Sequence, residues 1–264
     1  MAKISLTSLL SNTLGDFSVY TQRGVEGAII RAKGGPSAKQ IKTEPKFESL
    51  RLHQSEFAGV GKLNGYLLKA CKGVKKLADF NFSGQFSRMS KLIQNLDTLN
   101  AAGQRSIVFS KAGALYNGFN MNKTNPFSSV VILTPGWNFS RSEVKATVNF
   151  PELHPTITLK NPWNLPMFRF VLALGNIPDM IYNIGYVPSN PLMKYANATV
   201  FTSWQSSNAI LTAFSEVIQL SNLVNLDDSG TLLLSVGIEF GVTVADGVVV
   251  PVKHAGCAKI LGVG

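Results

Sequence analysis

The 264-residue sequence is poor in cysteine, histidine and charge, and each shortage excludes a class of protein. Its two cysteines, Cys71 and Cys257, cannot build a disulfide framework or a cysteine-rich zinc module. The three histidines, His53, His154 and His254, share no metal-ligand spacing. Only 15% of the residues are charged against 45% hydrophobic, which excludes a disordered chain. No apolar run approaches the ~20 residues of a membrane-spanning helix, so we expect no membrane span.

Catalytic motifs are also missing. The sequence contains no Gly-x-Ser-x-Gly elbow and no dinucleotide-binding fingerprint. The stretch from Gly59 to Leu63 lacks the first glycine of a phosphate loop and has Leu63 where Ser or Thr should follow Lys62. Asp227 and Asp228 precede Ser-Gly and are typical of a turn, because a calcium loop needs more spaced oxygen ligands. We therefore expect no catalytic residue, metal or cofactor, and predict that the protein is not an enzyme.

Positive charge is abundant in the first half only. Through Thr124 there are 18 Lys and Arg against 7 Asp and Glu, which is +11. The remainder has 7 against 8, which is −1. This asymmetry predicts two domains, residues 1–124 and 125–264, and an acidic partner for the first. Nucleic acid, an anionic surface and the acidic face of a neighbouring subunit all fit, and a basic surface that only maintains solubility is the alternative.

The first 35 residues predict a β-hairpin. Residues 17–21 alternate as a short strand does, 23–27 form a glycine-bracketed turn, and 28–33 supply a second strand. A hairpin alone is marginally stable in water, so it must pair with another sheet, in its own chain or in a neighbour.

Residues 37–100 predict helices. One apolar stripe repeats at three-and-four spacing through Leu63, Tyr66, Leu67, Ala70, Cys71, Val74 and Leu77. A second helix is predicted over residues 83–100. Three glycines, Gly59, Gly61 and Gly65, predict a kink, a break or a close helix contact within the first helical stretch.

After residue 125 the pattern becomes strand-like. We predict strands over residues 129–133, 143–150, 156–159, 167–174, 198–204, 231–240 and 247–252. Many short strands without intervening amphipathic helices favour an antiparallel β-sandwich, immunoglobulin-like or jelly-roll. The expected fold class is thus α+β, with an N-terminal hairpin and a basic helical region before the sandwich.

Two sets of side chains are candidate binding sites. The basic set could contact nucleic acid or another polyanion, bridge to a neighbouring subunit, or simply form a solvated helix face, and it comprises Lys62, Lys69, Lys72, Lys76, Arg88 and Lys91. Aromatic residues are not interleaved with these lysines, as single-strand binders require. The second set consists of three tryptophans in turn-rich surroundings, Trp137, Trp163 and Trp204. They could bind a ligand or a carbohydrate, and the alternative is that they fill the core.

The N-terminal stretch is distinctive as a sequence. Residues 15–41, with Phe47, Arg51, Glu56 and Phe57 downstream, resemble the opening of a family of uncharacterised Bacteroidetes proteins. Those proteins begin with a glycine-marked strand pair ending in Arg, then a Thr/Ser-x-x-Gln turn, then a helix with spaced Arg and Phe. Residues 37–40 match that turn, although the usual proline is displaced to position 36. The resemblance covers about the first 60 residues and implies no activity.

A self-assembling structural or surface protein, forming a filament, sheet or particle, is the leading hypothesis from the sequence. Both ends of the chain are glycine-tipped and strand-like, and strand addition joins subunits through main-chain hydrogen bonds alone. The candidate intersubunit strands contain Phe17, Val19, Ile29, Ile30, Val248 and Val250. Ser and Thr interrupt any apolar signal segment within the first ten residues, so we expect cytoplasmic synthesis. The sequence leaves the final compartment open, with release by lysis or export by another route as alternatives.

Overall fold

A computed structural model describes residues 17–20, 22, 25–32, 34–191, 195–223 and 226–264. Its internal contacts divide the chain into two compact units, residues 1–51 and residues 52–264. This division lies far from the boundary between residues 124 and 125 that the charge distribution predicted. Charge marks the solvent side of a segment, whereas a unit is defined by the core that its apolar side chains share.

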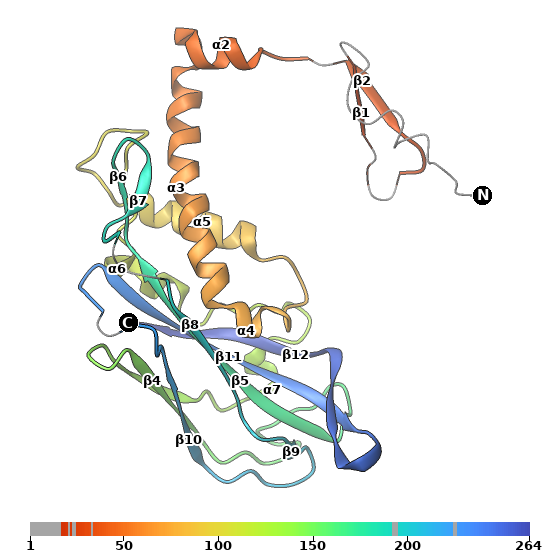
Figure 1. The fold of residues 1–264 in the computed structure, drawn as a ribbon. Helices are drawn as coiled ribbons and strands as arrows, with labels where there is room; N and C mark the ends of the chain where they lie inside the picture. The colour runs from red at the N-terminus through yellow and green to blue at the C-terminus, as the bar shows by residue number, and fades with distance from the viewer. Residues whose placement is uncertain (1–16, 21, 23–24, 33, 192–194, 224–225) are drawn as a thin grey trace. The chain divides into compact units, whose positions relative to one another are not determined.

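The smaller unit contains a hairpin and a short helical segment (Figure 1). The elements are β1 (Phe17–Tyr20), β2 (Ile29–Ala32), α2 (Ala38–Thr43) and the 3-10 turn η1 (Pro45–Phe47). Ser37 caps α2, because its hydroxyl accepts from the Gln40 N–H at 3.2 Å while Gln40 Oε1 accepts from the Ser37 N–H at 2.7 Å. The Arg51 guanidinium then donates to the carbonyls of Ile41 and Glu44 at 2.8 and 2.9 Å. These contacts connect the start of α3 to the segment before it.

The larger unit contains two antiparallel sheets. The five-stranded sheet runs β12–β11–β5–β8 with β9 also pairing β5, and its strands are β5 (Met167–Pro178), β8 (Asn197–Phe201), β9 (Gln205–Ser206), β11 (Gly230–Thr243) and β12 (Val249–Val263). The three-stranded sheet runs β10–β4–β3, from β3 (Gly136–Ser140), β4 (Lys145–Phe150) and β10 (Phe214–Gln219). A small separate hairpin joins β6 (Met180–Tyr182) to β7 (Tyr186–Pro188).

The two sheets share an apolar core between their facing surfaces. Phe150 and Phe214 of the smaller sheet stack with ring centroids 4.7 Å apart, and Phe150 also packs on Phe170 of the larger sheet at 4.3 Å. Ile218 and Leu234 belong to the same buried cluster. The predicted α+β fold, with an N-terminal hairpin, helices and antiparallel sheets, is confirmed.

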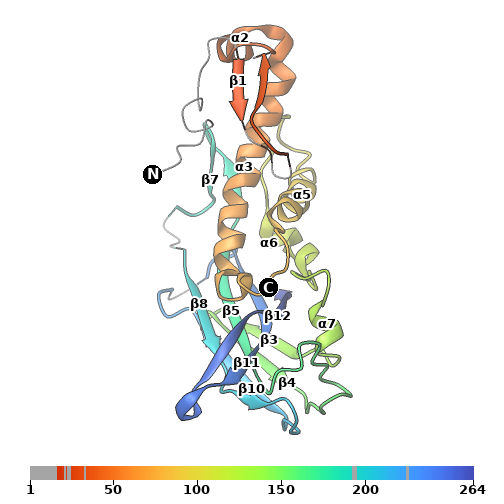
Figure 2. The same cartoon turned by 90° about the vertical axis from the view of Figure 1, so that its right-hand side faces the viewer.

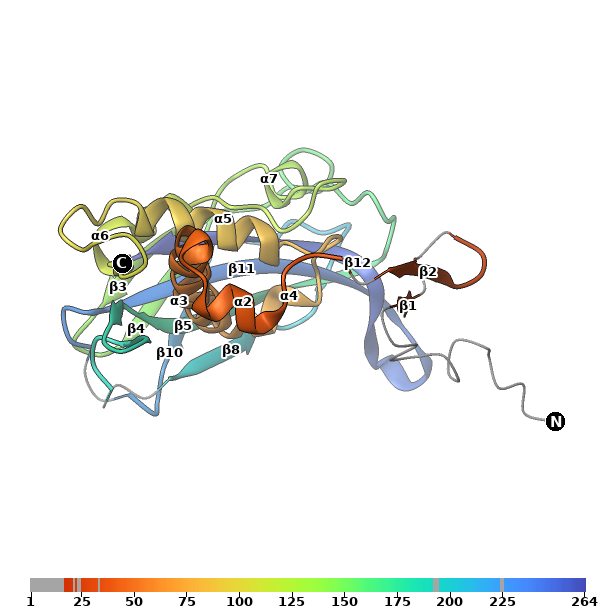
Figure 3. The ribbon, with the colours of Figure 1, turned by 90° about the horizontal axis from the view of Figure 1, so that it is seen from above.

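Helices cover the opposite face of the five-stranded sheet (Figures 2 and 3). They are α3 (Glu48–Ala70), α4 (Lys72–Lys75), α5 (Ser83–Gln94), α6 (Phe109–Ala112) and the 3-10 turn η2 (Gly113–Tyr116). The predicted stripe supplies Leu63, Leu67 and Val74, which share one buried cluster with Val171 and Leu233 of the sheet. The helical region after residue 51 is therefore a third layer on the sheets and belongs to the same compact unit. None of the helices in the described ranges is both long and apolar enough to span a membrane.

The glycines of α3 do not break the helix, which runs unbroken past all three. Only Gly59 marks a close approach, because a Cβ placed there would lie 2.5 Å from the ring of Tyr186. Gly61 and Gly65 face open space. The predicted break was therefore wrong, and the close contact is made with a strand residue.

Two predicted strands are not strands. Residues 129–133 overlap the short helix α7 (Phe127–Val130), which follows Pro126 and whose first N–H donates to Asn120 Oδ1 at 3.0 Å. Residues 156–159 form a turn, in which the N–H groups of Thr158 and Leu159 both bond the His154 carbonyl at 3.0 Å. Val, Ile and Thr are enriched in strands, but this preference depends on context, so composition misled here.

Candidate assembly surfaces

The hairpin of the smaller unit has one face that is entirely apolar. Cross-strand pairs Phe17–Ala32 and Val19–Ile30 place four apolar side chains on one face. Phe17 is 49% exposed and Ile30 is 57% exposed. Among the described residues this apolar face is largely exposed, which makes it a candidate surface for a partner.

The polar side chains on the other face of the hairpin interact with one another. The Arg31 Nε donates to Ser18 Oγ at 3.4 Å, and its guanidinium lies 5.4 Å from the centre of the Tyr20 ring. Ile29 also lies on this face, because it pairs with Tyr20. Of the predicted hairpin residues, Phe17, Val19 and Ile30 therefore share the apolar face and Ile29 does not.

The C-terminal candidates lie at the projecting tip of the β11–β12 hairpin (Figure 2). Val248 is 56% exposed and Val250 is 43% exposed, next to the 3-10 turn η3 (Ala245–Gly247). The far end of β12 is already paired within the chain. Met121 donates to the Ala258 carbonyl at 2.8 Å, and Ile260 donates to the Phe119 carbonyl at 2.9 Å. The candidate surface on this strand pair is therefore its tip.

Four of the six predicted basic residues already interact within the chain. Lys62 donates to the Tyr186 carbonyl at 2.6 Å, and the Lys69 ammonium lies near the rings of Tyr66 and Tyr195. Lys76 pairs with Glu239 at 2.7 Å and Lys91 pairs with Glu56.

The two remaining cations of this set, Lys72 and Arg88, are exposed and make no ion pair or hydrogen bond with the described residues. They lie on different helices, α4 and α5. Of the six cations, only Lys76 and Lys91 are paired with a carboxylate, so four positive charges of the set are not neutralised by the described residues.

Sequence reasoning missed three buried carboxylates among the described residues, of which Asp179 is 7% exposed. Glu56 is 2% exposed and Glu239 is 1% exposed. Glu239 accepts from Arg169 Nε at 2.7 Å, and the Arg169 guanidinium lies 4.4 and 4.5 Å from the rings of Phe201 and Trp204. A signal existed for Glu56, because it falls four residues before Val60 on the buried side of α3.

The tryptophans do not converge on one site. Trp204 packs against Arg169, and Trp163 packs against Phe240 with ring centroids 5.1 Å apart. Trp137 lies directly on Gly262 of β12, although it remains 39% exposed. Trp163 lines a cavity of about 210 Å³ beside Asp79 and His254. Core filling accounts for Trp163, and a stacking platform for sugars is not assembled from these three rings.

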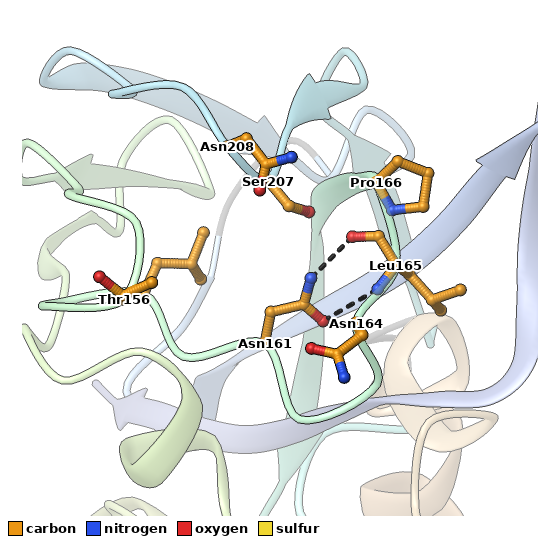
Figure 4. A pocket seen from close by; sticks show the side chains of 8 residues that line it. Thr156, Asn161, Asn164, Leu165, Pro166, Ser207 and Asn208 are labelled. Carbon is orange, nitrogen blue, oxygen red and sulfur yellow. Dashed lines mark hydrogen bonds between the residues drawn. The ribbon is translucent and has the colours of Figure 1, made fainter.

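The loops beside β5 enclose an uncharged cavity of about 280 Å³ (Figure 4). Asn161 uses both ends of its side-chain amide on the Leu165 backbone, at 2.7 and 3.4 Å, which holds the loop in shape. Ser207 is buried there, and its hydroxyl has no hydrogen-bond partner among the described residues. The side-chain amide of Asn161 is thus already hydrogen-bonded within the loop, and no charged group lines the cavity.

A larger cavity, of about 580 Å³, is mainly apolar. It lies between the end of α5, the following loop, α6 and β6, and Leu96, Leu99 and Ile181 line it. Leu96 is 69% exposed and Leu99 is 95% exposed. This groove is a second apolar surface, on the larger unit.

Neither the cysteines nor the histidines belong to a metal-binding cluster of the described residues. Cys71 and Cys257 are free and buried, and burial raises the pKa of the Cys71 thiol to about 12. Within the described ranges, no three His, Cys, Asp or Glu side chains gather as a metal-binding group would require.

No protein-family model, no curated protein and no solved structure matches this chain.

Proposed function

We propose that the protein is a structural subunit that assembles with copies of itself, and that the N-terminal hairpin joins the copies. The uncovered apolar face of the hairpin carries this proposal. Burying an exposed Phe or Ile side chain stabilises a contact by roughly 1.5–3 kcal/mol. Phe17 and Ile30 together can therefore outweigh much of the entropy lost on association.

The β-strand character of the hairpin supports the same function. A two-stranded sheet has an unpaired edge on each side, and a third strand is what makes such a sheet stable. Main-chain hydrogen bonds at that edge would position one copy against the next without special side chains.

The test compares the same charge on the two faces of the hairpin. Light scattering and electron microscopy of nuclease-treated protein should show ordered assemblies for the natural chain. Ile30→Glu places a carboxylate in the apolar face, and we expect the concentration for half-assembly to rise about tenfold or more, because desolvating an unpaired charge costs more than 1.4 kcal/mol.

Ser18→Glu is the matched control, because it puts the carboxylate beside Arg31 on the polar face. Because this carboxylate can pair with Arg31, it should raise the concentration for half-assembly by less than Ile30→Glu does. A natural chain that stays monomeric at high concentration would refute the proposal, and so would equal assembly by both variants.

A further inference from the structure

The edge strand β8 presents a row of unpaired backbone groups. Thr202 donates to the Phe170 carbonyl at 3.0 Å, and Asn176 donates to the Ala196 carbonyl at 3.3 Å. The β5–β8 register is continuous between these two bonds. Hydrogen-bonded and outward-facing residues alternate along an antiparallel pair, so the backbone groups of three β8 residues point away from β5: Asn197, Thr199 and Phe201.

No backbone hydrogen bond joins these outward groups to another residue in the described ranges. The Asn197 side chain bonds the Lys69 carbonyl at 3.1 Å, but this leaves the Asn197 main chain unpaired. The free edge is five residues long. It matches the four-residue strands of the hairpin.

The other sheet edges are less open. Residues 118–122 bond the outer side of β12, as described above. Strand β3 lies against the end of β12, where Trp137 and Phe139 pack on Gly262 and Gly264. Strand β10 carries a carboxylate, Glu216, at its centre.

The sequence of β8 has none of the devices that protect an edge. Proteins blunt exposed edges with lysine, proline, bulges or inward charge. Strand β8 reads Asn-Ala-Thr-Val-Phe, which has no charge and no proline and favours pairing through Thr, Val and Phe. An unprotected edge of this kind is a template for another strand.

We propose that the β8 edge receives the β1–β2 hairpin of a second copy, an inference that rests on the proposed function. The two faces match. Ala198 and Val200 of β8 pack on the core between the sheets, and the apolar hairpin face would continue that side. Thr199 lies on the helix side against Gly73, and the polar hairpin face with Ser18 and Arg31 would continue there.

This contact joins two different surfaces of the same chain. Each copy gives one hairpin and offers one edge, so the interaction is heterologous and builds a closed ring or an open filament. The five-stranded sheet gains the two hairpin strands at each junction.

A proline at the β8 edge tests whether β8 is the strand that receives the hairpin. Thr199→Pro removes an outward N–H that β5 does not use, so the intramolecular sheet should survive while the added strand loses a hydrogen bond. We expect the concentration for half-assembly to rise at least tenfold. Thr199→Ala keeps the N–H and controls for the lost side chain.

Val217→Pro is the matched edge control. On β10, Leu220 donates to the Val144 carbonyl at 3.1 Å, so the alternate residue Val217 also points its N–H outward. Val217 is 51% exposed. This variant should assemble as the natural chain does, and thermal unfolding of all three variants should confirm that each remains folded.

Cross-linking tests whether the hairpin of one copy lies beside β8 of another copy. One preparation carries Ser18→Cys and the other carries Thr199→Cys, and the natural cysteines are buried. Mixing them under copper-phenanthroline oxidation should yield a disulfide-linked heterodimer, which neither preparation gives alone. Ser18→Cys mixed with Val217→Cys should give none.

The outcomes separate the two proposals. If the natural chain does not assemble, the proposed function fails. If it assembles but tolerates Thr199→Pro and yields no mixed disulfide, only the β8 assignment is overturned. An intramolecular disulfide in a chain carrying both Ser18→Cys and Thr199→Cys, with none in the mixture, would place the hairpin on its own edge and overturn the second-copy assignment.

Discussion

Glu56→Ala is expected to lower the free energy of unfolding by about 3 kcal/mol, the lower end of the range for breaking a buried ion pair. The Glu56 carboxylate accepts from the Lys91 ammonium and from the Gly103 N–H at 2.9 Å, and it lies 3.8 Å from the Arg105 guanidinium. Removing it leaves the Gly103 N–H without an acceptor. Lys91 keeps some contact with water, which limits the loss.

The same substitution should change how stability depends on pH. Burial by itself would raise the pKa of Glu56, but Lys91, the Gly103 N–H and Arg105 outweigh burial and hold the pKa below 4.5. The folded pKa lies below the unfolded one, so the stabilisation is present above about pH 4.5 and is lost as pH falls through the folded pKa. The difference in unfolding free energy between the natural chain and Glu56→Ala should therefore shrink between pH 7 and pH 3.

Chemical denaturation at both pH values measures this difference. Glu143→Ala is the control, because Glu143 pairs with Lys145 on the surface, where ion pairs contribute little. An unfolding free energy for Glu56→Ala within error of the natural chain at pH 7 would show that the ion-pair group does not stabilise the fold.

Hydrophobic periodicity predicted which side chains face the core. It could not predict which residues contact each other across the core. The stripe through Leu63 and Leu67 identified the buried side of α3, and the hairpin at residues 17–32 followed from alternation and its glycine turn. The sequence predicted strand β5, but the covering of both faces of this strand was not inferred from it. From Phe170 to Pro178 every residue is buried, and a continuous apolar run of this kind indicates a strand covered on both faces. Such covering predicts that helices pack directly on the sandwich.

For the candidate assembly surfaces too, some features could be predicted from the sequence and others could not. Exposure of Phe17 and Ile30 was predictable, because a short hairpin cannot bury both faces. The intramolecular partners of Lys62 and Lys76 were not, because Tyr186 and Glu239 lie more than 100 residues away in the sequence. The open edge of β8 was equally hidden, since which strand lies at an edge depends on sheet order.

The close approach of α3 to β5 gives the second large effect. A Cβ on Gly175 of β5 would lie 2.6 Å from the Ala70 Cβ and 2.7 Å from the Ala70 Cα. Gly175→Ala must therefore push the end of α3 away from the sheet, and we expect the free energy of unfolding to fall by about 1–3 kcal/mol. This is opposite in sign to the gain of about 0.4–1 kcal/mol that Gly→Ala brings through the unfolded state where the site has room.

Gly136→Ala on β3 is the matched strand control, because its Cβ would meet only the Asn149 Cβ, at 3.9 Å. Its stability should stay the same or rise slightly. The double variant Gly175→Ala with Ala70→Gly removes the 2.6 Å contact but keeps the one to the Ala70 Cα, so part of the loss should be recovered. Strictly additive losses in thermal and denaturant unfolding would mean that α3 and β5 are not in contact at this point.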